Sequence, residues 1–161
     1  MSNEISKQQA KVLFERAYKN QMRGNLTEAI YLYQRSIETH PLPEAYTFLG
    51  WTYSLLRRYQ DAIDMCHEAI KIDPDYGNPY NDIGAYLIEL EKLDEAIEWL
   101  EKATKAVRYD APQYPYYNLG RIYQQKGRYQ TALQCYNQAL VIDPLYFNAI
   151  RAKYTLLGRM N

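Results

Sequence analysis

Apolar residues recur every three or four positions along most of the chain, the spacing that places them on one face of an α-helix. In residues 116–144, one apolar face around Leu119 and Tyr123 is followed by a turn at Gly127 and a second face around Ala132. This stretch predicts two helices joined by a turn. Because neither helix can bury its apolar face alone, we expect the pair to stack against similar pairs.

Small residues indicate that the helix pair is repeated four times. The first helices carry one small residue at intervals of 33, 34 and 36, at Ala17, Gly50, Gly84 and Gly120. The second helices carry alanines at the same three intervals, at Ala29, Ala62, Ala96 and Ala132. The units are therefore about 10–42, 43–76, 77–112 and 113–146. An amphipathic stretch at 147–158 predicts a last helix that covers the apolar face left open by the fourth unit.

Local signals predict where some helices begin. Residues 1–7 form a polar lead-in, and Ser6, with a glutamine three residues later, resembles the N-cap of the first helix. Asn78 is expected to cap the first helix of the third unit, with Pro79 in its first turn. The proline that closes the second and fourth units is absent from the third, where Arg108 takes its place and two extra residues follow.

Composition disfavours several classes of function. Lys and Arg together number 19, as do Asp and Glu, so bulk attraction to nucleic acid or to an anionic membrane is not expected. The cysteines, Cys66 and Cys135, have no metal-ligand spacing and are expected to be reduced and buried. The histidines, His40 and His67, fit no metal or nucleophile motif, and His67 is predicted on a solvated helix face. We predict no enzyme, no metal and no cofactor.

No stretch of the sequence resembles a membrane span or a secretion signal. The start of the chain lacks an apolar signal region, and no apolar run reaches the length of a spanning helix. The sequence therefore predicts a soluble, cytoplasmic protein.

The period and the landmark residues resemble the tetratricopeptide (TPR) repeat, a helix–turn–helix unit of about 34 residues. The resemblance covers about residues 10–146. It implies an all-α fold, a right-handed α-solenoid of four units with a terminal capping helix, forming a single domain over 1–161. It also implies a concave groove lined by the first helix of each unit.

Helix geometry predicts which residues line that groove. Positions 2, 5, 9 and 12 of each unit cluster on the side away from the core positions. From these positions we select aromatic, arginine and isoleucine side chains that could anchor a partner, and amide or hydroxyl side chains that could bond its backbone. The predicted peptide-binding residues are Phe14, Tyr18, Thr47, Trp51, Asn78, Asn81, Ile88, Tyr114, Tyr117, Arg121 and Gln124. For Phe14 and Tyr18 a second interpretation is open, in which the start of the chain folds over both rings.

The carboxylate clamp of chaperone-binding TPR proteins is disfavoured. That clamp holds the acidic C-terminus of heat-shock chaperones with lysine, arginine and asparagine at fixed positions of three successive units. Read from the first unit, the chain offers Phe14, Tyr18, Phe48, Asn78 and Asp82. Read from the second, it offers Thr47, Trp51, Asp82, Tyr114 and Asn118. Neither set supplies the cations, so capture of a chaperone terminus by this mechanism is not expected.

The sequence therefore predicts a non-catalytic adaptor that binds an extended peptide or an amphipathic helix in an aromatic-lined groove. The irregular stretch 107–117 either widens the groove and presents Tyr109 and Tyr114, or is a longer connection whose tyrosines pack locally. An alternative function is a self-associating scaffold. In this alternative two copies form a homodimer through the last helix, whose apolar residues are Leu156, Leu157 and Met160. A third hypothesis, RNA binding, has still less support, because no basic residue recurs at the same position of successive units.

Overall fold

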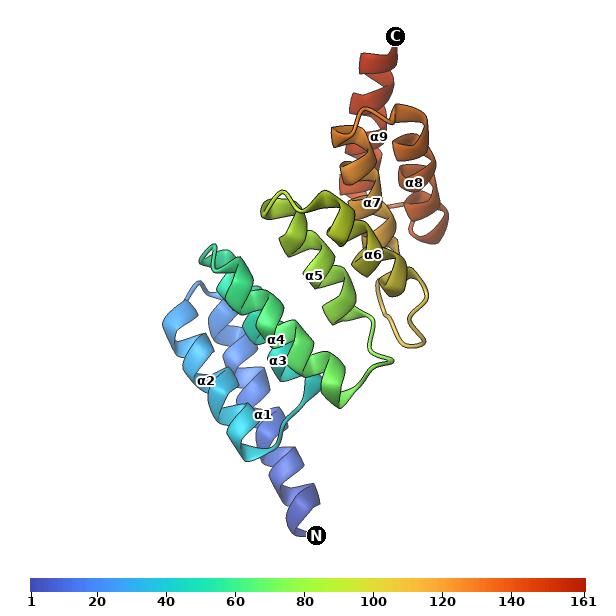
Figure 1. Cartoon of the computed structure of the whole chain (residues 1–161). Coiled ribbons are helices and arrows are strands. Elements are labelled where there is room, and N and C mark those ends of the chain that lie inside the picture. Colours follow the sequence, from blue (N-terminus) through green and yellow to red (C-terminus); the bar gives the residue numbers. More distant parts are fainter.

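The computed structural model describes all 161 residues, and they form nine helices with one isolated β-bridge (Figure 1). The helices are α1 (Ser2–Met22), α2 (Leu26–Thr39), α3 (Pro43–Leu55), α4 (Tyr59–Ile72), α5 (Asn78–Glu89), α6 (Leu93–Thr104), α7 (Gln113–Gln125), α8 (Tyr129–Ile142) and α9 (Phe147–Met160). Consecutive helices pair as α1/α2, α3/α4, α5/α6 and α7/α8, and α9 packs on the last pair. The fold is an all-α solenoid, as the sequence predicts.

The pairs stack in one direction, so the two ends of the chain lie at opposite ends of the array (Figure 1). Each first helix also contacts the first helix of the next pair, which produces a continuous row of α1, α3, α5, α7 and α9. The core lies between the helices of each pair and between neighbouring pairs. The landmark alanines of the second helices are fully buried there, at Ala29, Ala62, Ala96 and Ala132. Their small side chains let the helices approach closely.

The turn inside each pair uses a residue with positive φ. Gly24 and Gly127 take this position in the first and fourth units, with φ of 82° and 74°. Arg57 and Glu91 take it in the second and third units, both with φ of 60°. A residue with a Cβ atom pays about 1 kcal/mol for this conformation. The two middle turns are therefore less favourable than the two outer ones.

The first helix begins earlier than predicted. It starts at Ser2, and Ser6 lies inside it, where its hydroxyl donates a hydrogen bond to the Ser2 carbonyl oxygen at 3.0 Å. The lead-in contains no glycine or proline, and its Glu and Lys residues favour helix, as do the two glutamines that follow it, so the helix extends through it. The N-terminal turns project away from the array (Figure 1), so they do not fold over Phe14 or Tyr18.

The start of α5 also differs from the prediction. Asn78 is its first helical residue and Gly77 holds the N-cap position, so the Asn78 side chain makes no capping hydrogen bond. Its Oδ1 atom is buried without a hydrogen-bond partner. Asn78 therefore contributes a polar atom that the fold does not use, and that atom lies on the row of first helices.

The irregular segment before α7 is attached to the start of α5 through its backbone. The Arg108 N–H donates to the Asp75 carbonyl oxygen at 3.0 Å, and the Gly77 N–H donates to the Arg108 carbonyl oxygen at 2.8 Å. Tyr109 then packs against Gly77, where an added Cβ atom would come within 2.4 Å of the Tyr109 ring. Tyr109 therefore packs locally rather than projecting into solvent, and burial raises the pKa of its hydroxyl.

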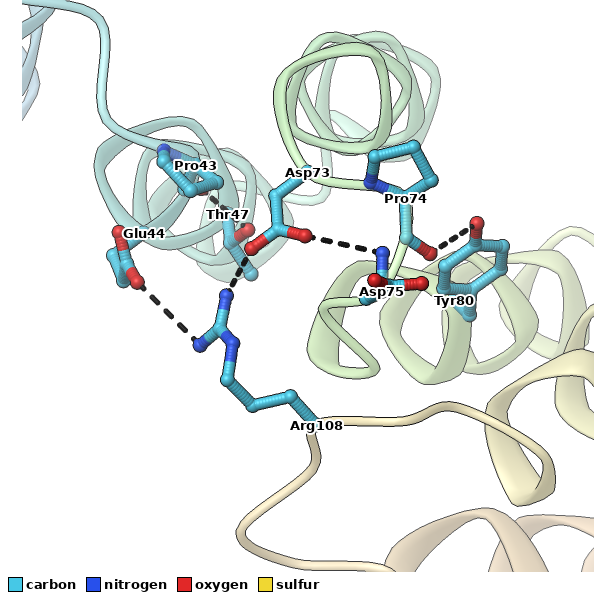
Figure 2. A network of polar contacts seen from close by, with 8 residues as sticks. All are labelled: Pro43, Glu44, Thr47, Asp73, Pro74, Asp75, Tyr80 and Arg108. Carbon is cyan, nitrogen blue, oxygen red and sulfur yellow. Dashed lines mark hydrogen bonds and ion pairs between the residues drawn. The ribbon is translucent and has the colours of Figure 1, made fainter.

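The Arg108 side chain connects this segment to both helices of the second pair (Figure 2). Its guanidinium forms an ion pair with Asp73 at the end of α4 and a longer one, at 3.7 Å, with Glu44 in the first turn of α3. It also lies over the Tyr76 ring, 4.5 Å from the centroid. The hydrogen bond from Arg108 lowers the pKa of the Asp73 carboxyl. The residue that replaces the closing proline thus holds the enlarged third connection in place.

Candidate functional site

All of the predicted groove residues lie on the first helices of the four pairs. Phe14 and Tyr18 are on α1, and Thr47 and Trp51 are on α3. The others divide between α5, with Asn78, Asn81 and Ile88, and α7, with Tyr114, Tyr117, Arg121 and Gln124. Because these helices contact one another in a row, the predicted residues lie along one side of the solenoid, but not all of them reach its surface.

An aromatic cluster occupies the N-terminal part of this row. The Phe48 ring lies at its centre, with ring centroids 5.1 Å from Phe14, 5.7 Å from Tyr18 and 5.9 Å from Trp51. Trp51 and Tyr18 keep more than a third of their surface exposed. The sequence selection omitted Phe48 because it follows a predicted lining position rather than occupying one. An aromatic residue next to Thr47 was the signal that could have identified it.

A cavity of about 480 Å³ lies in the middle of the row, and we name it the central pocket. It is lined by Phe48, Trp51, Ser54, Asn78, Asp82, Ala85, Tyr86, Tyr109 and Tyr114. Three of the predicted residues, Trp51, Asn78 and Tyr114, therefore meet in one place. The irregular segment before α7 supplies Tyr109 to the wall of the pocket. Tyr109 therefore packs on Gly77 and also lines the pocket.

Asp82 is the one acidic residue that lines the central pocket. Its carboxylate takes part in none of the ion pairs of the chain. A hydrogen bond from the Asn81 side-chain amide, at 3.4 Å, is the only one it receives from a side chain. Burial raises the pKa of Asp82 to about 7, and the bond from Asn81 offsets part of that increase. The pocket therefore contains a poorly compensated carboxylate.

A second cavity, of about 420 Å³, lies between α7 and α9, and we name it the C-terminal pocket. Predicted residues Tyr117, Arg121 and Gln124 line it together with Arg151 and Arg159 of α9. Arg121 is already paired with Glu89 at 3.2 Å. Gln124 accepts a hydrogen bond from the Tyr136 hydroxyl at 2.8 Å, so its carbonyl oxygen is engaged.

Tyrosines connect the two pockets. The Tyr146 ring packs against Tyr114 at 5.3 Å and against Tyr117 at 5.4 Å, measured between centroids. Tyr114 lines the central pocket and Tyr117 lines the C-terminal pocket. The aromatic cluster, the central pocket and the C-terminal pocket therefore follow one another along the row of first helices.

Three predicted lining residues are buried and do not reach the groove surface. Thr47 donates its hydroxyl hydrogen to the Pro43 carbonyl oxygen at 2.8 Å. Asn81 accepts a hydrogen bond at 3.0 Å from Asn118 of the next first helix. Ile88 belongs to the main apolar core. The position rule treats each helix as isolated. In the structure α3 and α5 each contact a first helix on both sides, so a smaller part of their surface is exposed.

Two other expectations about side-chain placement need correction. His67 is half-buried rather than fully solvated, and it packs edge-on against the Trp99 ring, with centroids 5.2 Å apart. Leu156 is fully buried against Ala132 and Tyr136, so it cannot form an apolar docking surface on the last helix.

No group of three His, Cys, Asp or Glu side chains is placed to hold a metal ion. None of the helices combines the length and hydropathy that a membrane span requires.

Family models of the tetratricopeptide repeat match residues 43–76 and 75–144, which together span the second to fourth helix pairs. The chain is a TPR protein. Heat shock protein STI1 of Saccharomyces cerevisiae is 33% identical over 78 residues, covering 47% of this chain and 13% of the relative. BBSome complex member BBS4 of Bos taurus is 26% identical over 124 residues, covering 76% of this chain and 23% of the relative. The chain thus spans less than a quarter of the length of these curated relatives.

Solved TPR structures resemble this one along most of its length. A structure from a characterisation of Pseudomonas aeruginosa pilF has a TM-score of 0.87 at 18% identity, covering 96% of this chain and 70% of that chain. The first TPR of Spaghetti (RPAP3), bound to the HSP90 peptide SRMEEVD, has a TM-score of 0.68 at 26% identity. It covers 75% of this chain and 95% of that chain. The solenoid architecture is therefore shared with proteins of low sequence identity.

Proposed function

We propose that this TPR protein is a non-catalytic adaptor that holds a segment of a partner protein in the groove along its first helices. The observation that carries the proposal is that the Phe48 cluster, the central pocket and the C-terminal pocket all lie along the first helices. Exposed aromatic rings beside pockets are typical anchors of protein interfaces. The bound HSP90 peptide of the RPAP3 repeat supports peptide binding as a use of this architecture.

Removing two exposed rings of the groove should weaken binding of a partner peptide at least about tenfold. The variant is Trp51→Ala/Tyr114→Ala, because both rings line the central pocket and neither is buried in the core. Short random peptides displayed on phage would first be selected on the wild-type protein. Fluorescence anisotropy of the selected peptides then gives the dissociation constants of both proteins.

The matched control is Tyr31→Ala/Tyr129→Ala, which removes two exposed rings from second helices, away from the groove. This variant should bind the selected peptides as the wild type does. The groove would be ruled out as the binding site if both double variants weakened peptide binding equally, or if Trp51→Ala/Tyr114→Ala did not weaken it. Circular dichroism confirms that each variant keeps its helix content.

A second candidate function is self-association through the C-terminal end of the solenoid. Leu145 is 86% exposed, and Phe147 and Tyr154 are 67% and 64% exposed. Phe147 and Tyr154 are seven residues apart on α9 and so share a face. These residues replace the predicted Leu156 as the apolar surface that a second copy would cover.

If the chain forms a homodimer there, Phe147→Ser/Tyr154→Ser should convert it to a monomer without loss of helix content. Sedimentation velocity over a range of protein concentrations measures the change. A wild-type protein that stays monomeric at the highest concentration would reject this candidate.

A further inference from the structure

We propose that the central pocket binds a basic side chain, the guanidinium of arginine or the ammonium of lysine, from the partner segment. The inference rests on the proposed function, because it names the chemistry that one part of the groove selects. Its basis is the combination of an uncompensated carboxylate, an unused amide oxygen and five aromatic rings around one cavity.

The acceptor groups of the pocket receive few hydrogen bonds from the protein. Asp82 has no cation beside it, and its one side-chain hydrogen bond is a long one from Asn81. Asn78 lines the same cavity, and its Oδ1 atom is buried without a donor. A buried acceptor that receives no hydrogen bond raises the free energy of the folded protein. A ligand that brings N–H groups can form the hydrogen bonds that the fold leaves unmade. A basic side chain carries several such donors and no acceptor.

The aromatic walls favour the same ligand. Five of the lining residues are aromatic: Phe48, Trp51, Tyr86, Tyr109 and Tyr114. The faces of such rings attract a cation, and the attraction increases where water is excluded. Arg108 on Tyr76 and Arg58 on Tyr53, each with its guanidinium carbon 4.5 Å from the ring centroid, show this contact elsewhere in the chain.

Other occupants fit the pocket less well. An acidic side chain or a phosphate would be repelled by Asp82, and an apolar side chain would remove more water from a carboxylate that has no counter-ion.

Binding of the basic group should depend on pH through Asp82 alone. The titratable groups that surround Asp82 are Cys66 of α4, Tyr76 before α5, Tyr86 of α5 and Tyr109. Burial raises the pKa of each above its ordinary value, so all four are neutral between pH 6 and pH 8. With a pKa of about 7, Asp82 is about nine-tenths ionised at pH 8 and about one-tenth ionised at pH 6.

The test titrates the ¹⁵N-labelled protein with N-acetylarginine amide and N-acetyllysine amide, with N-acetylcitrulline amide as the neutral isostere of the first. Saturable shifts are expected at the Trp51 indole N–H and at backbone amides of residues 78–86. The neutral probe should bind at least about tenfold more weakly. The affinity for the basic probes should fall about tenfold from pH 8 to pH 6, following the ionised fraction of Asp82.

Asp82→Asn should remove the preference for the basic probes, whereas Asp64→Asn, at an exposed position of α4, should preserve it. Equal binding of arginine and citrulline probes, shifts that persist in Asp82→Asn, or no shifts at all would overturn the inference. A failure of this inference can be distinguished from a failure of the proposed function. If peptides selected by the groove bind equally after their Arg and Lys residues become Gln, the adaptor function stands and the basic pocket does not.

Discussion

Asp82→Asn is expected to increase the free energy of unfolding by about 2–4 kcal/mol at pH 8. Burial raises the pKa of this carboxyl from 3.8 to about 7, so the charged form is destabilised in the folded protein relative to the unfolded chain. Asparagine has nearly the same shape and no charge to desolvate. Urea denaturation of both proteins, followed by circular dichroism at 222 nm, measures the difference.

The effect should depend on pH in a defined direction. Between about pH 4 and pH 7 the folded protein binds the Asp82 proton more tightly than the unfolded chain does, so this contribution to stability falls as the pH rises through that window. Above pH 7 the contribution of Asp82 to stability no longer changes with pH. The stability difference between Asp82→Asn and wild type should therefore grow from about zero near pH 4 to its full value near pH 8. The exposed control Asp64→Asn should show no such growth.

The sign of this effect separates two roles for Asp82. A carboxylate that stabilises the fold through an ion pair or a cap would make its asparagine variant less stable. A carboxylate held for recognition costs stability, and its removal strengthens the fold while weakening function. A loss of stability in Asp82→Asn at pH 8 would assign the residue a structural role and contradict the basic-pocket inference as well.

The repeat architecture could be predicted from the sequence because packing between helices depends on small residues at fixed intervals. Ala62, Ala96 and Ala132 are fully buried, and larger residues there would hold the two helices of a pair apart. The N-terminal extension of α1 was missed for a different reason. Residues 1–7 show no apolar periodicity and so predict a lead-in, whereas a run of good helix formers that adjoins an existing helix needs no buried face to continue it.

The groove could be predicted only in part. A position rule for one helix identifies Trp51 and Tyr114, because both lie where no neighbouring helix covers them. It fails at Thr47 and Ile88, because neighbouring packing buries them.

The chemistry of the central pocket was missed entirely. Burial raises the pKa of Asp82, and the cavity that Asp82 lines takes one wall from Tyr109 of the irregular segment before α7. That segment is held by Arg108, whose ion pair with Asp73 spans 35 residues of sequence. No local pattern of residues encodes such a contact, so sequence spacing alone could not reveal the site.

Gly120→Ala is expected to lower the free energy of unfolding by about 1–3 kcal/mol, although alanine is the better helix former. An added Cβ atom at Gly120 would lie 2.4 Å from Cε1 of the Tyr136 ring. That ring cannot easily move away. It is 1% exposed, its hydroxyl donates to Gln124 at 2.8 Å, and Tyr117 packs beside it. Relief of the clash must therefore separate α7 from α8 or break the hydrogen bond.

Gly158→Ala is the matched control, because an added Cβ atom at Gly158 meets nothing within 4 Å. It isolates the gain in helix propensity and should leave the protein unchanged or stabilise it by up to about 1 kcal/mol. Urea denaturation of the two variants and the wild type decides the result. If Gly120→Ala is as stable as Gly158→Ala, the Tyr136 ring yields freely, and the close approach of α7 and α8 does not set the position of Gln124 in the C-terminal pocket.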